Sequence, residues 1–125
     1  MEEKSLRGLG DSLITAIDLF NNQQWHEAHD VLEDIWNYLD GDERQIIQGI
    51  LQVSVSQLHL TRKNTNGGTI LLGEGLGRLK TRKDIDLGID LESFCDLLES
   101  ILNKLQQKEP LNEEDIPHIK FTGLM

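Results

Sequence analysis

The sequence holds a single cysteine, Cys95, among its 125 residues. An internal disulfide needs two cysteines, so none can form within this chain. Cys95 lies in an apolar helical pattern, and no histidine stands near it in the sequence to activate a thiolate. We therefore predict that Cys95 is a buried thiol that packs as a small hydrophobic side chain.

Long apolar segments are also missing from the sequence. No apolar run approaches the ~18 residues that a membrane-spanning helix needs. The first ten residues, MEEKSLRGLG, lack the basic stretch followed by an apolar run that marks a signal peptide. From these features we expect a cytoplasmic protein.

Basic residues are few, with 12 Lys and Arg against 22 Asp and Glu, which gives a formal net charge of -10. A surface this acidic repels nucleic acid phosphates and anionic lipid headgroups. We therefore expect no nucleic acid partner and no membrane partner. Cations and basic partners suit the charge better, and an apolar helix face could also form a homodimer.

Apolar residues recur at helical spacing along most of the chain, and no segment shows the period-two alternation of a strand. Helices are predicted over about 5–20, 24–39, 43–62, 69–80 and 91–107. The predicted fold class is all-α, a single-domain bundle of about five helices spanning 1–125. It has a helical core over about 5–107 and an irregular C-terminal tail over 108–125, whose apolar residues should pack along the surface.

Several local signals bound these helices. Asn22 could cap the second helix and Asp90 the fifth, because each side-chain oxygen can accept a bond from a free backbone N–H. Residues 63–68, KNTNGG, read as a tight loop. The fourth helix carries glycines that each cost up to ~1 kcal/mol against alanine, which predicts close approach of another backbone, that of the third helix. These are Gly73, Gly75 and Gly77.

The segment WHEAHDVLEDIW, residues 25–36, concentrates the residues that could carry chemistry. His29 and Glu33 are four apart and therefore neighbours on a helix surface, as are His26 and Asp30. Imidazole nitrogens and carboxylate oxygens together suit zinc, manganese, iron or nickel. The HEAH sequence at 26–29 is not the HExxH motif of zinc proteases, whose histidines are four apart.

A single helix rarely supplies a full coordination sphere, so further ligands are sought on the next helix. Gln48, Gln52 and His59 fall on one polar stripe of the predicted third helix. A short turn should make the second and third helices antiparallel, which would place His59 near the level of His29 and Gln52 near Glu33.

Two interpretations remain open from these residues. In the first, His29, Glu33 and His59 bind a divalent metal of unknown identity, with Trp36 as a wall of the site and His26 and Asp30 in support. In the second, the chain is a non-enzymatic interaction module, and His29, Glu33, Gln52 and His59 form a buried polar network. The tryptophans would then serve only as packing anchors.

Two blocks of the sequence resemble a bacterial and archaeal family known as domain of unknown function 309. His29, Glu33 and Trp36 fit its HxxxExxW motif within FNNQQWHEAHDVLEDIW, and QGILQVSVSQLHLTRKNTNGGTILL resembles its second block. The resemblance covers about residues 13–80, with a further Ile-Pro similarity at 116–117.

This resemblance implies an all-helical fold and a motif suspected of binding metal. Family members are often labelled metal-dependent hydrolases, although no reaction is implied for this chain. Carried over, the suspected site residues are His29, Glu33 and Trp36, with His59 as a contributor from the next helix. The chain departs from the family at Gly68, where alanine is usual, and at His26, which is therefore the least secure ligand.

Overall fold

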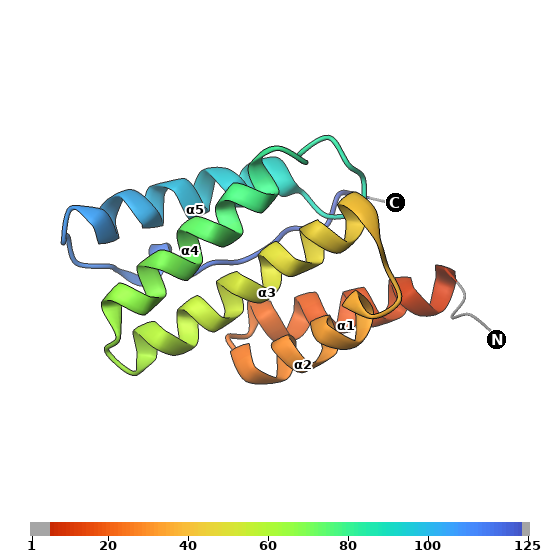
Figure 1. The fold of residues 1–125 in the computed structure, drawn as a ribbon, viewed down its shortest axis with the longest axis horizontal. Coiled ribbons are helices and arrows are strands. Elements are labelled where there is room, and N and C mark those ends of the chain that lie inside the picture. The colour runs from red at the N-terminus through yellow and green to blue at the C-terminus, as the bar shows by residue number, and fades with distance from the viewer. Residues whose placement is uncertain (1–5, 124–125) are drawn as a thin grey trace.

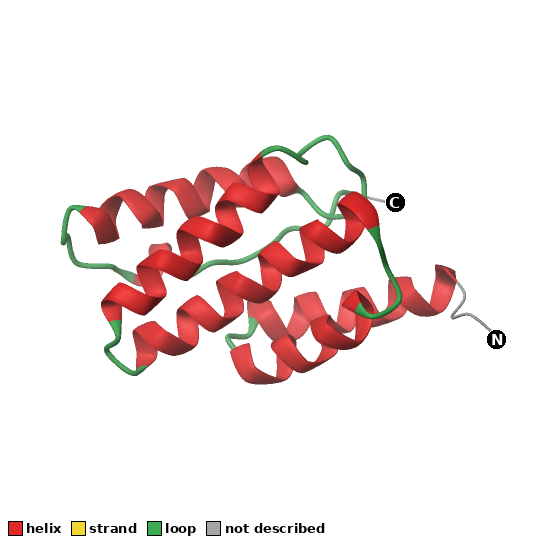
Figure 2. Cartoon of the chain, in the orientation of Figure 1, coloured by secondary structure: helices red, strands yellow, loops and turns green. Residues whose placement is uncertain are grey.

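A computed structural model describes residues 6–123 of the chain, with side chains from residue 9 onward. Within this range the all-α prediction is confirmed (Figures 1 and 2). The helices are α1 Leu6–Asn21, α2 Trp25–Trp36, α3 Gly41–Thr61, α4 Thr65–Lys80, α5 Leu91–Gln106 and the short 3-10 helix η1 Glu113–Asp115. Residue 5, where the first helix was expected to begin, lies outside the described residues. No helix among residues 6–123 combines the length and apolar character needed to cross a membrane.

Each helix packs against the one that follows it, and α3 lies between α2 and α4 (Figure 1). After α5 the tail runs back along the bundle to the segment that precedes α5. There the backbone N–H of Asp90 donates to Lys120 at 2.8 Å, and that of Thr122 donates to Gly88 at 3.0 Å. The tail is thus fixed to the bundle, as the sequence predicted.

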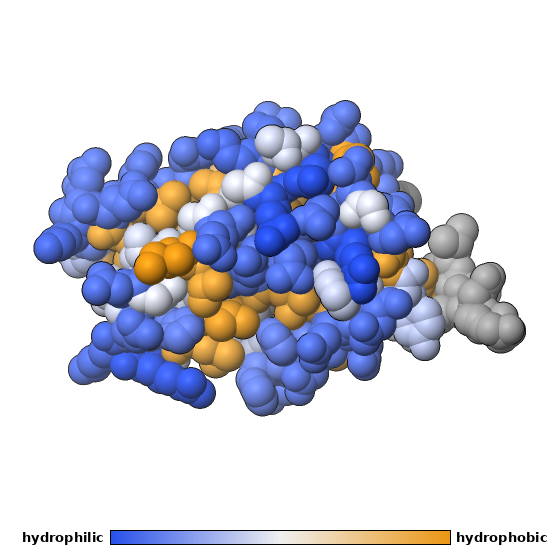
Figure 3. Space-filling model, in the orientation of Figure 1, coloured by the Kyte–Doolittle hydropathy of each residue, from blue (hydrophilic) through white to orange (hydrophobic). Residues whose placement is uncertain are grey.

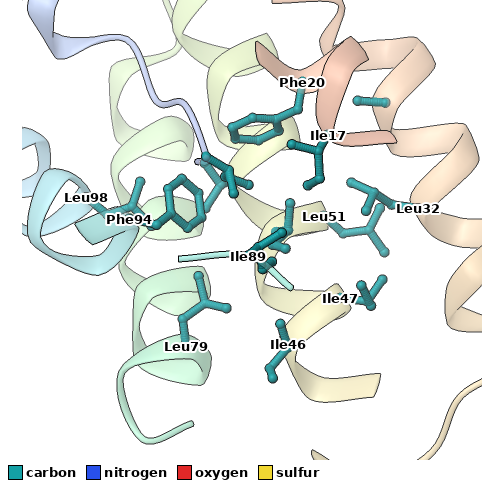
Figure 4. Packing of buried hydrophobic residues seen from close by; sticks show 14 of the residues in the cluster. Ile17, Phe20, Leu32, Ile46, Ile47, Leu51, Leu79, Ile89, Phe94 and Leu98 are labelled. Carbon is teal, nitrogen blue, oxygen red and sulfur yellow. The ribbon is translucent and has the colours of Figure 1, made fainter. Parts of the chain in front are cut away.

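The core contains side chains from all five α-helices together with Ile89 and Ile119 (Figure 4). Phe20 is fully buried, and its ring meets those of Trp25 and Phe94 edge-on, at centroid distances of 5.0 and 5.7 Å. Trp25 is therefore a core anchor. Cys95 is buried as predicted, and burial raises the pKa of its thiol to about 11.

Helices α3 and α4 pack closely because each has a glycine at the contact, Gly49 on α3 and Gly75 on α4. A Cβ atom built on Gly75 would lie 2.7 Å from the carbonyl oxygen of Gly49, and one on Gly49 would lie 3.0 Å from that of Gly75. Gly77 has no atom within 4 Å of such a Cβ. The predicted close approach to α3 is confirmed at Gly75 but not at Gly77, nor at Gly73, where a Cβ would meet only Leu102 of α5 at 4.0 Å.

Three local predictions were wrong. Asn22 does not cap α2, since its amide donates to the carbonyl of Asp18 at the end of α1. Helix α2 ends at Trp36 instead of 39, and residues 37 and 38 form a turn. Helix α4 begins at Thr65 instead of 69, because the side chain of Asn64 accepts a bond from the N–H of Gly67 at 3.1 Å and caps the helix inside the expected loop. The predicted cap at Asp90 is confirmed by its bond from the N–H of Ser93.

A buried ion pair holds the start of the tail against α5. The Asp115 carboxylate accepts from the N–H of Asn112 at 2.8 Å and from the Lys104 ammonium at 2.9 Å. The hydrogen bond from Asn112, followed by that from Lys104, holds the pKa of Asp115 below its usual value. The ionised Asp115 carboxylate therefore stabilises the fold above its unfolded-state pKa of about 4. This stabilisation is lost as pH falls through the lower pKa of the folded state.

Replacing Asp115 by asparagine is expected to reduce the pH dependence of the free energy of unfolding in acid. Asp115→Asn should be less stable than the parent chain at neutral pH, and the difference should shrink as pH falls below about 4. Urea unfolding across this pH range measures both effects. Glu113→Gln, an exposed neighbour, serves as the matched control. A constant difference at every pH would contradict the assignment.

Candidate functional site

The polar face of α2 brings three potential metal ligands together. One ligand atom each from His29, Asp30 and Glu33 lies within 4.8 Å of the others, and Nδ1 of His29 is 3.4 Å from Oδ1 of Asp30. The His29 side chain is 31% exposed and that of Asp30 65%. Helix α2 contains no lysine or arginine, so its own sequence supplies no cation to neutralise the carboxylates.

A cavity of about 300 Å³ opens beside this group. Helix α2 contributes His29, Glu33 and Trp36 to its lining. The opposite wall comes from α3 and one residue of α4, namely Gln48, Leu51, Gln52, Val55 and Leu71. The sequence placed Gln48 and Gln52 on this side of α3, and the structure brings both into one cavity with the HxxxExxW residues. Figure 3 shows the face over α3 and α4 as largely hydrophilic with smaller apolar areas.

Trp36 is held in place by an arginine that the sequence analysis did not identify. The guanidinium carbon of Arg44 lies 3.4 Å from the centroid of the Trp36 ring. A cation over an indole face is attracted by the negative charge of that face. Arg44 follows Trp36 across the turn between α2 and α3, so only the three-dimensional fold pairs them. The same indole ring that Arg44 covers also lines the cavity.

A polar network that includes Gln52 of the cavity wall links α3 to α4. The Gln52 amide donates to Glu74 at 3.1 Å and accepts from Nε of Arg78 at 2.9 Å, and Arg78 also donates to Gln45. Both polar atoms of the Gln52 side chain are thus engaged, which fixes the orientation of the amide. Gln48 makes no side-chain hydrogen bond within residues 6–123, so its amide remains available to a molecule in the cavity.

The remaining candidates lie apart from this group. Nδ1 of His59 lies 3.0 Å from the Asn64 amide, and His59 belongs neither to the ligand group nor to the cavity lining. Seven residues beyond Gln52, it shares the face of α3 but lies about 10 Å further along the helix. His26 is exposed and is likewise outside the ligand group.

The buried network proposed as an alternative does not form as expected. Glu33 is exposed and His29 is only half-buried, so neither is part of a buried polar cluster. Of the four residues expected in that cluster, only Gln52 belongs to the network between α3 and α4.

Comparison with known proteins identifies one family that part of this chain resembles. The model of a family described as "Domain of unknown function (DUF309)" matches residues 13–71. The match supports the resemblance to this family that the sequence predicted. The matched segment includes every residue that lines the cavity. Neither the curated proteins nor the solved structures gave a match.

Proposed function

We propose that the chain binds one divalent metal ion through His29, Asp30 and Glu33 at the mouth of the cavity. The observation that carries this proposal is the grouping of one imidazole and two carboxylates beside a cavity that His29, Glu33 and Trp36 line. Two ligand atoms about 2.1 Å from one ion in tetrahedral geometry lie about 3.4 Å apart. His29 and Asp30 already have this separation, and the exposed Glu33 side chain can rotate to complete the group.

The donor set favours a metal of intermediate softness. One nitrogen and two oxygens suit zinc, manganese, iron or nickel. Three protein ligands leave positions for water or for a group on a bound molecule, and a metal in such a site supplies an activated water for hydrolysis. In that role the cavity would hold the substrate, with Trp36 and the aliphatic side chains against its apolar part and the Gln48 amide against a polar group.

Isothermal titration of tag-free protein with zinc, manganese and nickel tests the proposal. His29→Ala and Glu33→Gln should each weaken binding about tenfold or more, because each removes one ligand. His26→Ala is the matched control, since it removes an exposed imidazole three residues away and should leave the affinity unchanged. Equal losses in His26→Ala and His29→Ala, or unchanged binding in both, would contradict the site.

A further inference from the structure

A second hollow lies at the N-terminal part of α1, apart from the cavity described above. It consists of two adjoining cavities of about 410 and 160 Å³, which share Gly10, Leu13 and Leu87. The larger is completed by Ile14, Gly88, Phe121 and Thr122, and the smaller by Leu9, Ile35, Leu39, Glu43 and Ile47. We call these residues the α1 groove. Its lining is almost wholly apolar.

Large apolar side chains remain exposed in the α1 groove. Ile14 is 49% exposed and Phe121 is 42% exposed, and both line the larger cavity. The backbone on either side of Phe121 is held in place, because Asp90 N–H donates to the carbonyl of Lys120 and Thr122 N–H donates to that of Gly88. Single exposed apolar residues are common on protein surfaces, but their grouping in one hollow is typical of an interaction site. The groove therefore presents a fixed apolar surface.

The charges around the α1 groove are mainly negative. Glu43 lines it, and Asp11, Asp40 and Asp86 are each adjacent in sequence to a lining residue. The basic residues adjacent to lining residues are Lys120 and Arg44, and the guanidinium of Arg44 lies over the Trp36 ring. Asp40 and Glu43 form no ion pair with any side chain in residues 9–123, where the side chains are described. These carboxylates are available to cations on a partner.

We propose that the α1 groove binds a basic amphipathic helix of another protein. The apolar face of that helix would enter the two cavities, and its lysines and arginines would meet Asp40 and Glu43. Helices bound in this way use apolar anchors spaced along one face, and complementary charge selects the partner. A second copy of this chain fits less well, because its net charge of -10 would bring acidic surfaces together.

A designed peptide provides a direct probe of this proposal. The probe is a fluorescent peptide of about 18 residues, or about five helical turns, with leucines on one face and lysines on the other. Fluorescence anisotropy should show saturable binding. A leucine–glutamate peptide of the same pattern should bind at least about tenfold more weakly, and so should a scrambled leucine–lysine peptide of the same composition.

One substitution can fill the groove without disturbing the fold. A Cβ atom on Gly10 would have no atom within 4 Å, and Gly10 lines both cavities. Gly10→Leu should therefore fold normally and weaken the peptide about tenfold or more. Gly77→Leu is the matched control, because Gly77 is also helical with an open Cβ position but lies on α4. Glu43→Gln should weaken binding and reduce its dependence on salt.

The results that would overturn the proposal are distinct. Equal binding by the Gly10→Leu and Gly77→Leu chains would place the peptide elsewhere, and equal binding of the ordered and scrambled peptides would indicate only general attraction to an acidic surface. Sedimentation velocity identifies the competing occupant: a dimer that Gly10→Leu abolishes would show that a second copy covers the groove. None of these outcomes depends on the metal site, which shares no residue with the groove.

Discussion

Phe20→Ala is expected to lower the free energy of unfolding by about 3–5 kcal/mol, the range for deleting a buried phenylalanine ring. The Phe20 side chain is fully buried and touches two other rings edge-on, those of Trp25 and Phe94. Its removal leaves a cavity and also breaks both aromatic contacts. Because whole domains are stable by only about 5–15 kcal/mol, the variant should be marginally folded. Urea unfolding followed by circular dichroism measures the loss.

Phe121→Ala provides a control within the same chain. Phe121 is 42% exposed and lies in the tail, so its removal should cost much less than that of Phe20. Losses of similar size in the two variants would contradict the view that the three-ring cluster is central to the core.

Gly75→Ala is expected to destabilise the protein by about 1–3 kcal/mol, the usual cost of overpacking. The added Cβ would lie 2.7 Å from the carbonyl oxygen of Gly49, so the backbones of α3 and α4 must move apart. This cost should exceed the ~1 kcal/mol that alanine gains over glycine from helix propensity. Thermal or urea unfolding measures whether the substitution lowers or raises the free energy of unfolding.

Gly77→Ala makes the same chemical change two residues further along α4. No atom lies within 4 Å of its new Cβ, so only the helix propensity should act, and the variant should be more stable by up to ~1 kcal/mol. The two substitutions are therefore expected to have opposite signs. Stabilisation by Gly75→Ala would show that α3 and α4 are not in close backbone contact there.

The sequence predicted the helices well where apolar periodicity determined them and less well at their ends. Leu39 continues the apolar stripe of α2 and is partly buried, as the stripe predicts. The helix nevertheless ends at Trp36, since a side chain can be partly buried from a non-helical segment as well. The start of α4 was missed because two glycines made the segment look like a loop. The helix forms despite the low helix propensity of Gly67 and Gly68. The Asn64 side chain caps it, and the Ser56 hydroxyl donates to the carbonyl of Gly68 at 2.7 Å.

In the candidate site, too, contacts within one helix could be predicted from sequence, whereas contacts between helices could not. His29, Asp30 and Glu33 lie on one helix, so their proximity follows from helical geometry and could be predicted from sequence. The stacking of Arg44 on Trp36 and the pairing of His59 with Asn64 depend on where helices end and how they pack. The polar stripe predicted the face of α3 on which His59 lies, but the level along the helix axis inferred from the antiparallel arrangement did not bring His59 into the cavity or the ligand group.

The proposed metal site is tested most directly by anomalous X-ray scattering from crystals of the protein grown with zinc. A single strong peak within about 2.0–2.2 Å of a His29 ring nitrogen and carboxylate oxygens of Asp30 and Glu33 is the predicted result. The peak should be lost in crystals of His29→Ala. A map with no peak beside His29, or with zinc only at His26 or His118, would contradict the proposal that these three side chains form a metal site.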